Sequence, residues 1–224
     1  MRSSRKPFDV PPSDFNLVHN LQGQWEKSRG IIQPMSSSVS PDDILDFWFG
    51  PPPHSSREVW FRKDSSFDTT IRDRFGETVR AAIEGEYSAW SATPRGALAR
   101  VILLDQFPRN IHRDTPLAFA GDAQALAAAQ DAIARGFDRQ LDFFERWFLY
   151  LPFEHSEDWA MQERSLELFG QLAAETGNRG PLEWAEKHAV VISRFGRYPH
   201  RNAVLGRVST PEEIAFLAEP GASF

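Results

Sequence analysis

The sequence of 224 residues contains no cysteine, which excludes disulfides, thiolate metal sites and cysteine nucleophiles. The absence fits a reducing compartment, and we expect the protein in the cytoplasm. No apolar run approaches the roughly 18 residues that a membrane span needs, so we expect no membrane partner. Lysine and arginine number 25 against 31 acids, a net charge of −6. Nucleic acid is not an expected partner, because binding it requires a broad basic surface.

Alternating apolar and polar residues are also missing, so no strand is predicted. Apolar residues recur instead at helical spacing, and capping residues and proline or glycine stops separate the helices. We expect helices over 41–49, 64–85, 93–107, 121–135, 138–150, 156–177, 181–195 and 210–219. The predicted fold class is all-α, a single domain over 41–224 with about nine or ten helices joined by short loops.

The helix boundaries rest on local signals. Ser40 followed by Pro41 predicts a helix start, and Thr210 with Glu213 forms a capping box. Gly50, Pro108 and Pro152 are expected to end helices, and Ser156 is expected to cap the helix that follows it.

The first 40 residues differ from the rest. They contain Pro11-Pro12, a serine run at 36–38 and only short apolar patches. This composition predicts a disordered leader over 1–40. Met35 lies just before the first clear helix signal, so it is a second candidate for the native start.

One stretch of this acidic chain contains no acid at all. Residues 187–210 hold no Asp or Glu, yet they include Arg197, His200, Arg201 and Arg207. Guanidinium groups bind phosphate and carboxylate bidentately, so the stretch indicates an anion-binding loop. The alternative is an ordinary solvated basic loop.

Two short segments of the chain resemble each other. Residues 107–110 read Phe-Pro-Arg-Asn and residues 198–202 read Tyr-Pro-His-Arg-Asn, each just beyond a predicted helix. The similarity is either chance or a sign of two loops that each present a guanidinium and an amide to one site. The second interpretation predicts that Arg109, Asn110, Arg201 and Asn202 bind the ligand together.

Several further polar side chains are candidates for proton transfer or binding. His188 lies on an apolar helical stripe, where a buried core histidine is the alternative to a site residue. His155 and Glu157 follow a helix stop, and the capping role expected for Glu157 is the alternative there. Arg146 and Tyr150 are four residues apart and share a helix face, which Gln162 of the next helix is expected to meet.

Arg100 and Asp105 interrupt the apolar run 97–107, and the acid must have a partner if it is buried. Arg100, Arg109 or a basic residue of 194–207 is the expected partner, and a structural ion pair is the favoured role. No histidine pair at metal-ligand spacing, nucleophile elbow or phosphate-binding glycine loop is present, so we predict no metal and no cofactor.

With these segments located, the chain resembles the family known as domain of unknown function 924. The resemblance rests on a set of blocks between about 41 and 219: residues 44–50, 60–61, 67–68, 102–110, 118–119, 145–157, Gln162, His188, 195–202, 205–207 and 209–210. Tyr198 and His112 stand where the family pattern has Phe and Tyr. The resemblance implies a tetratricopeptide-like superhelical fold and no established activity.

The leading hypothesis is a concave polar site that binds a small anionic, phosphate- or carboxylate-bearing ligand. The binding residues are Arg109, Asn110, Arg146, Gln162, Arg197, His200, Arg201 and Asn202, and the candidate catalytic residues for hydrolytic or acid–base chemistry are Tyr150, His155, Glu157 and His188. The competing hypothesis is a tetratricopeptide-like scaffold that grips an acidic peptide. A third interpretation makes every polar cluster structural. The sequence leaves the oligomeric state open.

Overall fold

The computed structural model describes residues 39–221, and within that part of the chain there is no strand. The all-α fold class is therefore confirmed. The predicted leader falls outside the described residues except for Val39 and Ser40, and Met35 lies outside them as well. No helix in this part of the chain is long and apolar enough to cross a bilayer.

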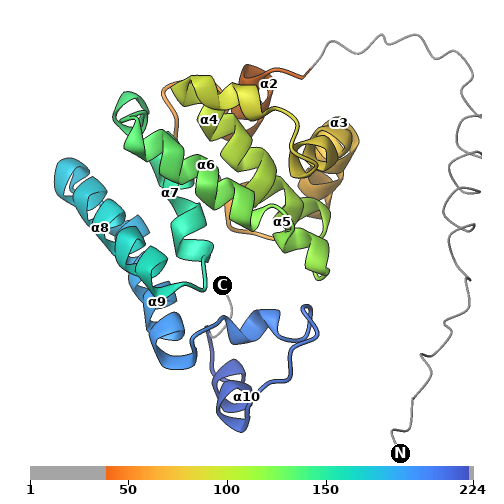
Figure 1. The fold of residues 1–224 in the computed structure, drawn as a ribbon, viewed down its shortest axis with the longest axis vertical. Coiled ribbons are helices and arrows are strands. Elements are labelled where there is room, and N and C mark those ends of the chain that lie inside the picture. Colours follow the sequence, from red (N-terminus) through yellow and green to blue (C-terminus); the bar gives the residue numbers. More distant parts are fainter. Residues whose placement is uncertain (1–38, 222–224) are drawn as a thin grey trace, which may run out of the picture. The chain divides into compact units, whose positions relative to one another are not determined.

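The α-helices follow one another along the chain (Figure 1). They are α2 (Pro41–Phe49), α3 (Ser65–Ile83), α4 (Pro94–Val101), α5 (Phe107–Ile111), α6 (Asp122–Ala134), α7 (Phe143–His155), α8 (Trp159–Thr176), α9 (Gly180–Phe195) and α10 (Pro211–Leu217). Single 3₁₀ turns are η2 (Glu58–Trp60), η3 (Ser88–Ala92), η5 (Pro116–Phe119), η6 (Asp138–Gln140) and η7 (Pro199–Arg201).

A π-turn, η4 (Ile102–Gln106), joins α4 to α5 without a break, so the two form one continuous helix. Counted in this way, residues 39–221 form eight α-helical segments. The predicted total of nine or ten was too high, although each of the eight ranges named from the sequence does contain a helix.

The predicted starts of three helices are confirmed in atomic detail. Ser40 and Thr210 each complete a capping box, and the Thr93 side chain accepts a hydrogen bond from the Gly96 N–H. The predicted stop at Gly50 and the predicted helix end at residue 195 are also confirmed. Gly50 and Gly196 follow these helices with positive φ, which glycine adopts without strain.

Pro108 does not end its helix, contrary to the prediction. The π-turn widens the helix just before this residue, and the Phe107 N–H donates to the Ile102 carbonyl five residues back. Because proline has no N–H, the Leu104 carbonyl four residues earlier loses its usual donor. Gly121 packs directly against that carbonyl, where a Cβ atom would overlap the Leu104 backbone. The close approach sets the start of α6.

Two further boundaries differ from the predictions. Pro152 lies inside α7, which runs on to His155 and begins only after Asp142, the N-cap of a capping box with Glu145. Ser156 does not cap α8; Asp158 does so by accepting a hydrogen bond from the Ala160 N–H. Local propensity placed each boundary within a few residues, and tertiary packing moved it.

The core is built from large aromatic side chains, as the composition indicates. Trp48 on α2 lies within 5.4–6.3 Å, between ring centroids, of Trp60, Phe67, Phe107 and Phe148. These residues come from α2, η2, α3, α5 and α7, so the aromatic core fixes those elements together. Edge-to-face and offset pairs at this spacing stabilise beyond the area they bury.

The second half of the domain is a helical hairpin. Helices α8 and α9 run side by side and antiparallel, joined through Gly177 in the left-handed conformation (Figure 1). Helix α7 packs against both. The C-terminal end of α7, the start of α8 and the segment after α9 therefore lie close together, and most of the polar residues of interest lie there.

Candidate functional site

A polar cluster forms where the end of α7 meets η4, α5, α9 and η7. It consists of Asp105, Arg109, Asp122, Glu154, His155, Glu157, Gln162, His188, Tyr198, His200, Arg201 and Arg207. Burying so many charged groups is costly unless each has a partner of opposite charge or a hydrogen-bond partner. Most members of the cluster have such a partner, and Arg201 lacks a hydrogen-bonded carboxylate.

Asp105 and His155 form a buried pair. Asp105 is 0% exposed, and its Oδ1 lies 2.7 Å from His155 Nδ1 and 3.1 Å from Arg109 Nη1. Burial alone would raise the pKa of Asp105, but the charge of Arg109 and the hydrogen bonds from His155 and Gln106 outweigh it and hold that pKa well below its usual range. Asp105 is therefore an ionised acceptor, which orients the imidazole.

His155 is held in one tautomer by this carboxylate. Burial lowers the pKa of His155 although the charge of Asp105 raises it, so the ring is neutral near pH 7. An ionised Asp105 accepts a hydrogen bond from the Nδ1–H, so the neutral ring has its lone pair on Nε2. The bond through Nδ1 is the single hydrogen bond of this ring within residues 39–221. The side chain is 15% exposed, so Nε2 is placed to accept a proton from a bound molecule.

Arg109 has a full set of anionic partners. Its two terminal nitrogens bind the two oxygens of Asp122 at 2.8 and 3.0 Å, and Nη1 also donates to the Asp105 carbonyl at 2.6 Å. Asp122 is the first residue of α6, directly after the Gly121 that packs on Leu104. Arg109 is thus an ion-pair residue that ties α5 to α6.

Arg201 is more deeply buried than Arg109 but has no carboxylate of its own. The residue is 7% exposed, and the carboxylate oxygen nearest to it in the described part of the chain is Asp122 Oδ2, 3.8 Å from Nη1. Its Nε has no hydrogen-bond partner among residues 39–221. The guanidinium carbon lies over the rings of Phe119 and Tyr198, 4.9 and 4.4 Å from their centroids. Burial and the nearby charge of Arg109 lower the pKa of Arg201.

The remaining arginines of the 187–210 stretch are paired. Arg207 binds both oxygens of Glu157 at 2.6 and 3.0 Å, and Glu157 also accepts the Tyr198 N–H at 2.8 Å. Arg197 binds both oxygens of Glu213 at 2.6 and 2.8 Å. The acid-free stretch thus obtains its counter-charges from the segment between α7 and α8 and from α10, and Arg201 is the exception among these three.

Glu154 and His188 form a second buried acid–imidazole pair. Glu154 is 3% exposed, and its Oε1 lies 3.2 Å from His188 Nδ1. Burial, and then the charge of Asp105, raise the pKa of Glu154 to about 8. Burial lowers the pKa of His188 to about 3, although Nδ1 donates to the Trp184 carbonyl. Both groups are neutral at pH 7, so Glu154 carries an O–H that can donate.

Gln162 and Tyr198 anchor the end of α7. The Gln162 Nε2 donates to the carbonyls of Glu154 and Ser156 at 2.9 and 2.6 Å, and the Tyr198 hydroxyl donates to the Glu154 carbonyl. These bonds satisfy carbonyls that a helix end leaves without a partner. They also fix the side chains of Glu154 and His155 relative to η7.

The structure places seven of the twelve predicted site residues in the polar cluster. The seven are Arg109, His155, Glu157, Gln162, His188, His200 and Arg201. His200 lies against Tyr198, with 5.5 Å between ring centroids, and burial lowers its pKa to about 4. The roles assigned to these residues stay predictions.

The other five predicted residues are bonded elsewhere. Arg146 and Tyr150 share a face of α7 as expected, but Tyr150 donates to Asp138 and Arg146 binds Glu175. Burial raises the pKa of Tyr150 to about 12. Asn110 donates to Asp68 at 2.7 Å, Asn202 donates to Ser209 and Glu213, and Arg197 is held by Glu213.

Five members of the cluster were not among the predicted site residues: Asp105, Asp122, Glu154, Tyr198 and Arg207. Asp105 had a signal, an acid within an apolar run, and was expected to be an ion pair. Its contact with Arg109 fits that expectation, and its contact with His155 goes beyond it. Asp122 carried no signal, because an acid at a helix start is ordinary.

A separate group of potential metal ligands lies at the start of α7. The side chains of His54, Asp142 and Glu145 place one ligand atom each within 4.8 Å of one another. The group has a structural explanation. Asp142 and Glu145 form the capping box of α7, His54 Nδ1 lies 2.5 Å from Asp142, and Arg95 binds Glu145 at 3.1 Å.

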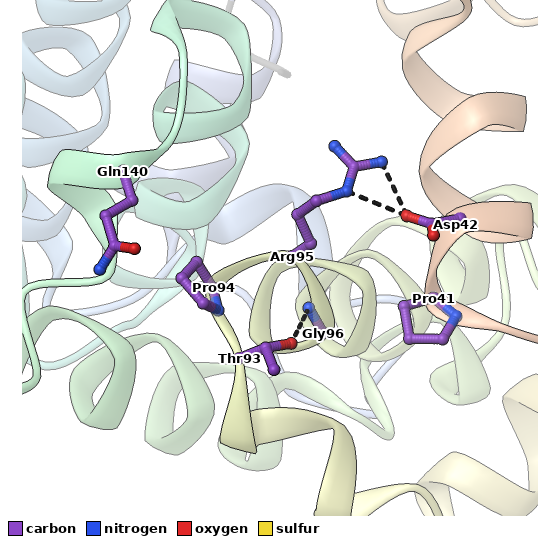
Figure 2. Close-up of a pocket in the computed structure, with 7 residues that line it drawn as sticks. All are labelled: Pro41, Asp42, Thr93, Pro94, Arg95, Gly96 and Gln140. Carbon is purple, nitrogen blue, oxygen red and sulfur yellow. Dashed lines mark hydrogen bonds and ion pairs between the residues drawn. The ribbon is translucent and has the colours of Figure 1, made fainter.

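A shallow hollow of about 430 Å³ lies between the starts of α2 and α4 (Figure 2). Its lining residues are Pro41, Asp42, Thr93, Pro94, Arg95, Gly96 and Gln140. Figure 2 shows Arg95 turned toward Asp42, and Thr93 accepting from the Gly96 N–H. Arg95 already bonds to Asp42 and Thr93 to Gly96, and none of the lining residues belongs to the polar cluster.

The fold and the cluster define an all-α protein in which a helical hairpin supports buried acid–imidazole pairs beside arginines. The chain belongs to the family described as "Bacterial protein of unknown function (DUF924)", whose model matches residues 44–221. It is similar to a solved structure, a protein of unknown function, ATU0120, from Agrobacterium tumefaciens. The two share 41% identity with a TM-score of 0.72, over 80% of this chain and 96% of the other. No curated protein matches the chain.

Proposed function

We propose that the polar cluster binds a small anionic group, a phosphate or a carboxylate, at Arg201. One observation carries the proposal: Arg201 is a buried guanidinium whose nearest carboxylate oxygen is 3.8 Å away and already bonded to Arg109. Arg109, Arg197 and Arg207 each have a bidentate carboxylate. A buried charge without a hydrogen-bonded counter-charge is destabilising, so its presence supports a binding role.

The same cluster supports acid–base chemistry on the bound molecule. Neutral His155, oriented by Asp105, offers a lone pair on Nε2 as a general base. Neutral Glu154 offers an O–H whose oxygen Oε2 has no partner among residues 39–221. A base and an acid whose surroundings separate their pKa values in this way are the arrangement that proton transfer near pH 7 requires. His155 takes the role of base and Glu154 that of acid.

The alternative is a tetratricopeptide-like scaffold for an acidic peptide in the cytoplasm. The antiparallel pair α8 and α9, with α7 packed against it, supports such an arrangement. The exposed apolar side chains Val190, Val208 and Ile214 on and after α9 would serve a peptide partner. The anion site ranks first, because a peptide groove gives no reason to bury Arg201.

The test is anion binding to the full chain. Inorganic phosphate and acetate are titrated at constant ionic strength, and the melting temperature and the histidine ring NMR signals are recorded. We expect at least one anion to raise the melting temperature and to shift the His155 signal. A ligand at about a hundred times its Kd adds roughly 2.7 kcal/mol, which is several degrees for a domain of this size.

Two variants locate the effect. Arg201→Met removes the buried guanidinium, and we expect it to abolish the anion response. Arg194→Met is the matched control, since it removes a half-exposed arginine of the same acid-free stretch, one paired with Glu212. An unchanged response in Arg201→Met, or no response of the unmodified protein to either anion, contradicts the proposal.

A further inference from the structure

Two features of the polar cluster bear on which anion it takes: its charge balance and the surroundings of Arg201. We infer that the group held at Arg201 is a carboxylate carrying a single charge, rather than a phosphate dianion. This inference rests on the proposed anion site.

The charges of the polar cluster balance before any ligand is bound. Its cations are Arg109, Arg201 and Arg207, and its ionised carboxylates are Asp105, Asp122 and Glu157. With neutral histidines and a neutral Glu154 the sum is zero. A single carboxylate makes the cluster −1 and a phosphate dianion makes it −2. Like charges repel more strongly in a buried site than in water, so the balance favours the smaller charge.

The position of Asp122 sharpens this argument. Its Oδ2 lies 3.8 Å from Arg201 Nη1 and also binds Arg109. An anion on Arg201 therefore has a fixed carboxylate next to it. One extra negative charge can be tolerated beside the two guanidinium groups, whereas a second has no free cation in the described part of the cluster to offset it.

The shape of the Arg201 site points the same way. The guanidinium carbon lies over two aromatic rings, those of Phe119 and Tyr198. Guanidinium N–H groups all point outward in the plane of the group. Because the two ring centroids lie 4.9 and 4.4 Å from the guanidinium carbon, we place the ligand at the outer edge of the group, in its plane. A carboxylate is itself planar and fits the fork with two parallel hydrogen bonds, whereas a phosphate adds oxygens outside the plane, toward the rings.

The carboxylate also suits the neighbouring His155. The imidazole is neutral, and its Nδ1–H already donates a hydrogen bond to Asp105. His155 therefore has no positively charged donor to offer a phosphate. A carboxylate on Arg201 needs none, and His155 Nε2 stays available as a base for another part of the same molecule. The ligand class is thus a monocarboxylate with a second functional group.

The experiment compares two small anions of different charge at pH 7, where Glu154 stays neutral. Acetate carries one charge, and methyl phosphate carries nearly two, since its second pKa is about 6. Each is titrated into the full chain at matched ionic strength while the histidine ring signals are followed. We expect acetate to bind at least about ten-fold more tightly and Arg201→Met to lose both responses. Arg201→Lys keeps the charge without the planar fork, and we expect it to lose most of the preference for acetate.

The outcomes separate the two claims. Methyl phosphate binding as tightly as acetate, with loss in Arg201→Met, overturns the carboxylate inference and leaves the anion site in place. Arg201→Lys retaining the full preference overturns the argument from the planar fork, and with it the assignment to a carboxylate. Binding of neither anion, or binding that survives Arg201→Met, overturns both the inference and the proposed function.

Discussion

The segments 107–110 and 198–202 share a short sequence, yet the structure uses their arginines differently. Arg109 and Arg201 lie close together, both over the ring of Phe119 and both directed toward Asp122. Arg109 binds both oxygens of Asp122, whereas Arg201 reaches one of them only at 3.8 Å. The guanidinium of Arg109 is hydrogen-bonded to a carboxylate of the protein, and that of Arg201 is not.

The asparagines of the two segments do not lie at the site where the two arginines come together. Asn110 bonds to Asp68 on α3, and Asn202 bonds to Ser209 and Glu213. The two guanidinium groups converge and the two amides diverge into separate structural networks. Two similar segments can therefore share a site through their arginines while the asparagine of each stabilises its own surroundings.

The largest effect should come from removing the satisfied arginine. Arg109→Met leaves the buried carboxylate of Asp105 and the partly buried one of Asp122 without their main partner. Removing one side of a buried pair costs about 3–5 kcal/mol, which corresponds to a fall in melting temperature of roughly ten degrees. Thermal and urea unfolding measure it. A loss of unfolding free energy below about 1 kcal/mol would mean that Arg201 replaces Arg109 as the partner of Asp122. The two arginines would then not differ in their role.

An intermediate effect concerns pH. The folded-state pKa of Glu154, about 8, lies above its unfolded value of 4.5. The folded state therefore holds a proton that the unfolded state has lost, so stability is highest at low pH and falls as pH rises toward 8. We expect the difference between the wild type and Glu154→Gln to change by about 1 kcal/mol per pH unit between roughly pH 5 and 8. Urea midpoints at several pH values test this.

The matched control for that experiment is Glu157→Gln. Glu157 is paired with Arg207, and its pKa is lowered because that pairing outweighs burial. The sign is then reversed: its contribution is present above the unfolded pKa and is lost as pH falls through the folded one. Equal pH profiles for the two variants would remove the distinction between an unpaired and a paired acid.

The smallest effect on stability should come from the unsatisfied arginine. Arg201→Met leaves Asp122 with its two bonds to Arg109 and replaces a buried charge by an apolar side chain of similar length. We expect a change within about 1 kcal/mol, because the lost ring contacts are offset by the removed desolvation cost. Urea unfolding without added anion measures it. A loss as large as that of Arg109→Met would identify Arg201 as a structural ion-pair residue.

The predictable part of the fold was local. Ser40, Thr93 and Thr210 cap helices through side chains one turn away, and such contacts are written in the sequence itself. The continuation through Pro108 was not predictable, because it depends on the π-turn before it and on Gly121 packing against Leu104. Both are consequences of how α6 packs on α4.

The predictable part of the cluster was similar in kind. The acid-free stretch and the repeated segment pointed to Arg109 and Arg201, and the odd acid in an apolar run pointed to Asp105. Which arginine is paired and which is not depends on Asp122, thirteen residues after Arg109 and far from Arg201 along the chain. Sequence spacing does not predict contacts between residues so far apart in the chain, so the difference between Arg109 and Arg201 could be seen only in the structure.

The π-turn has a consequence for how this chain tolerates change in length. A π-turn holds one residue more than an α-turn, and deleting one residue from 102–106 would restore regular α-helix. The surplus residue is taken up inside the turn, so Phe107 and the residues after it would keep nearly their present direction, with Arg109 near Asp122 and Asn110 near Asp68. Deleting a residue from α4 instead would turn everything after it by about 100°, and Arg109 would leave Asp122. Residues 102–106 are therefore the stretch of this helix in which losing one residue other than Asp105 disturbs the polar cluster least, at the cost of the packing of buried side chains.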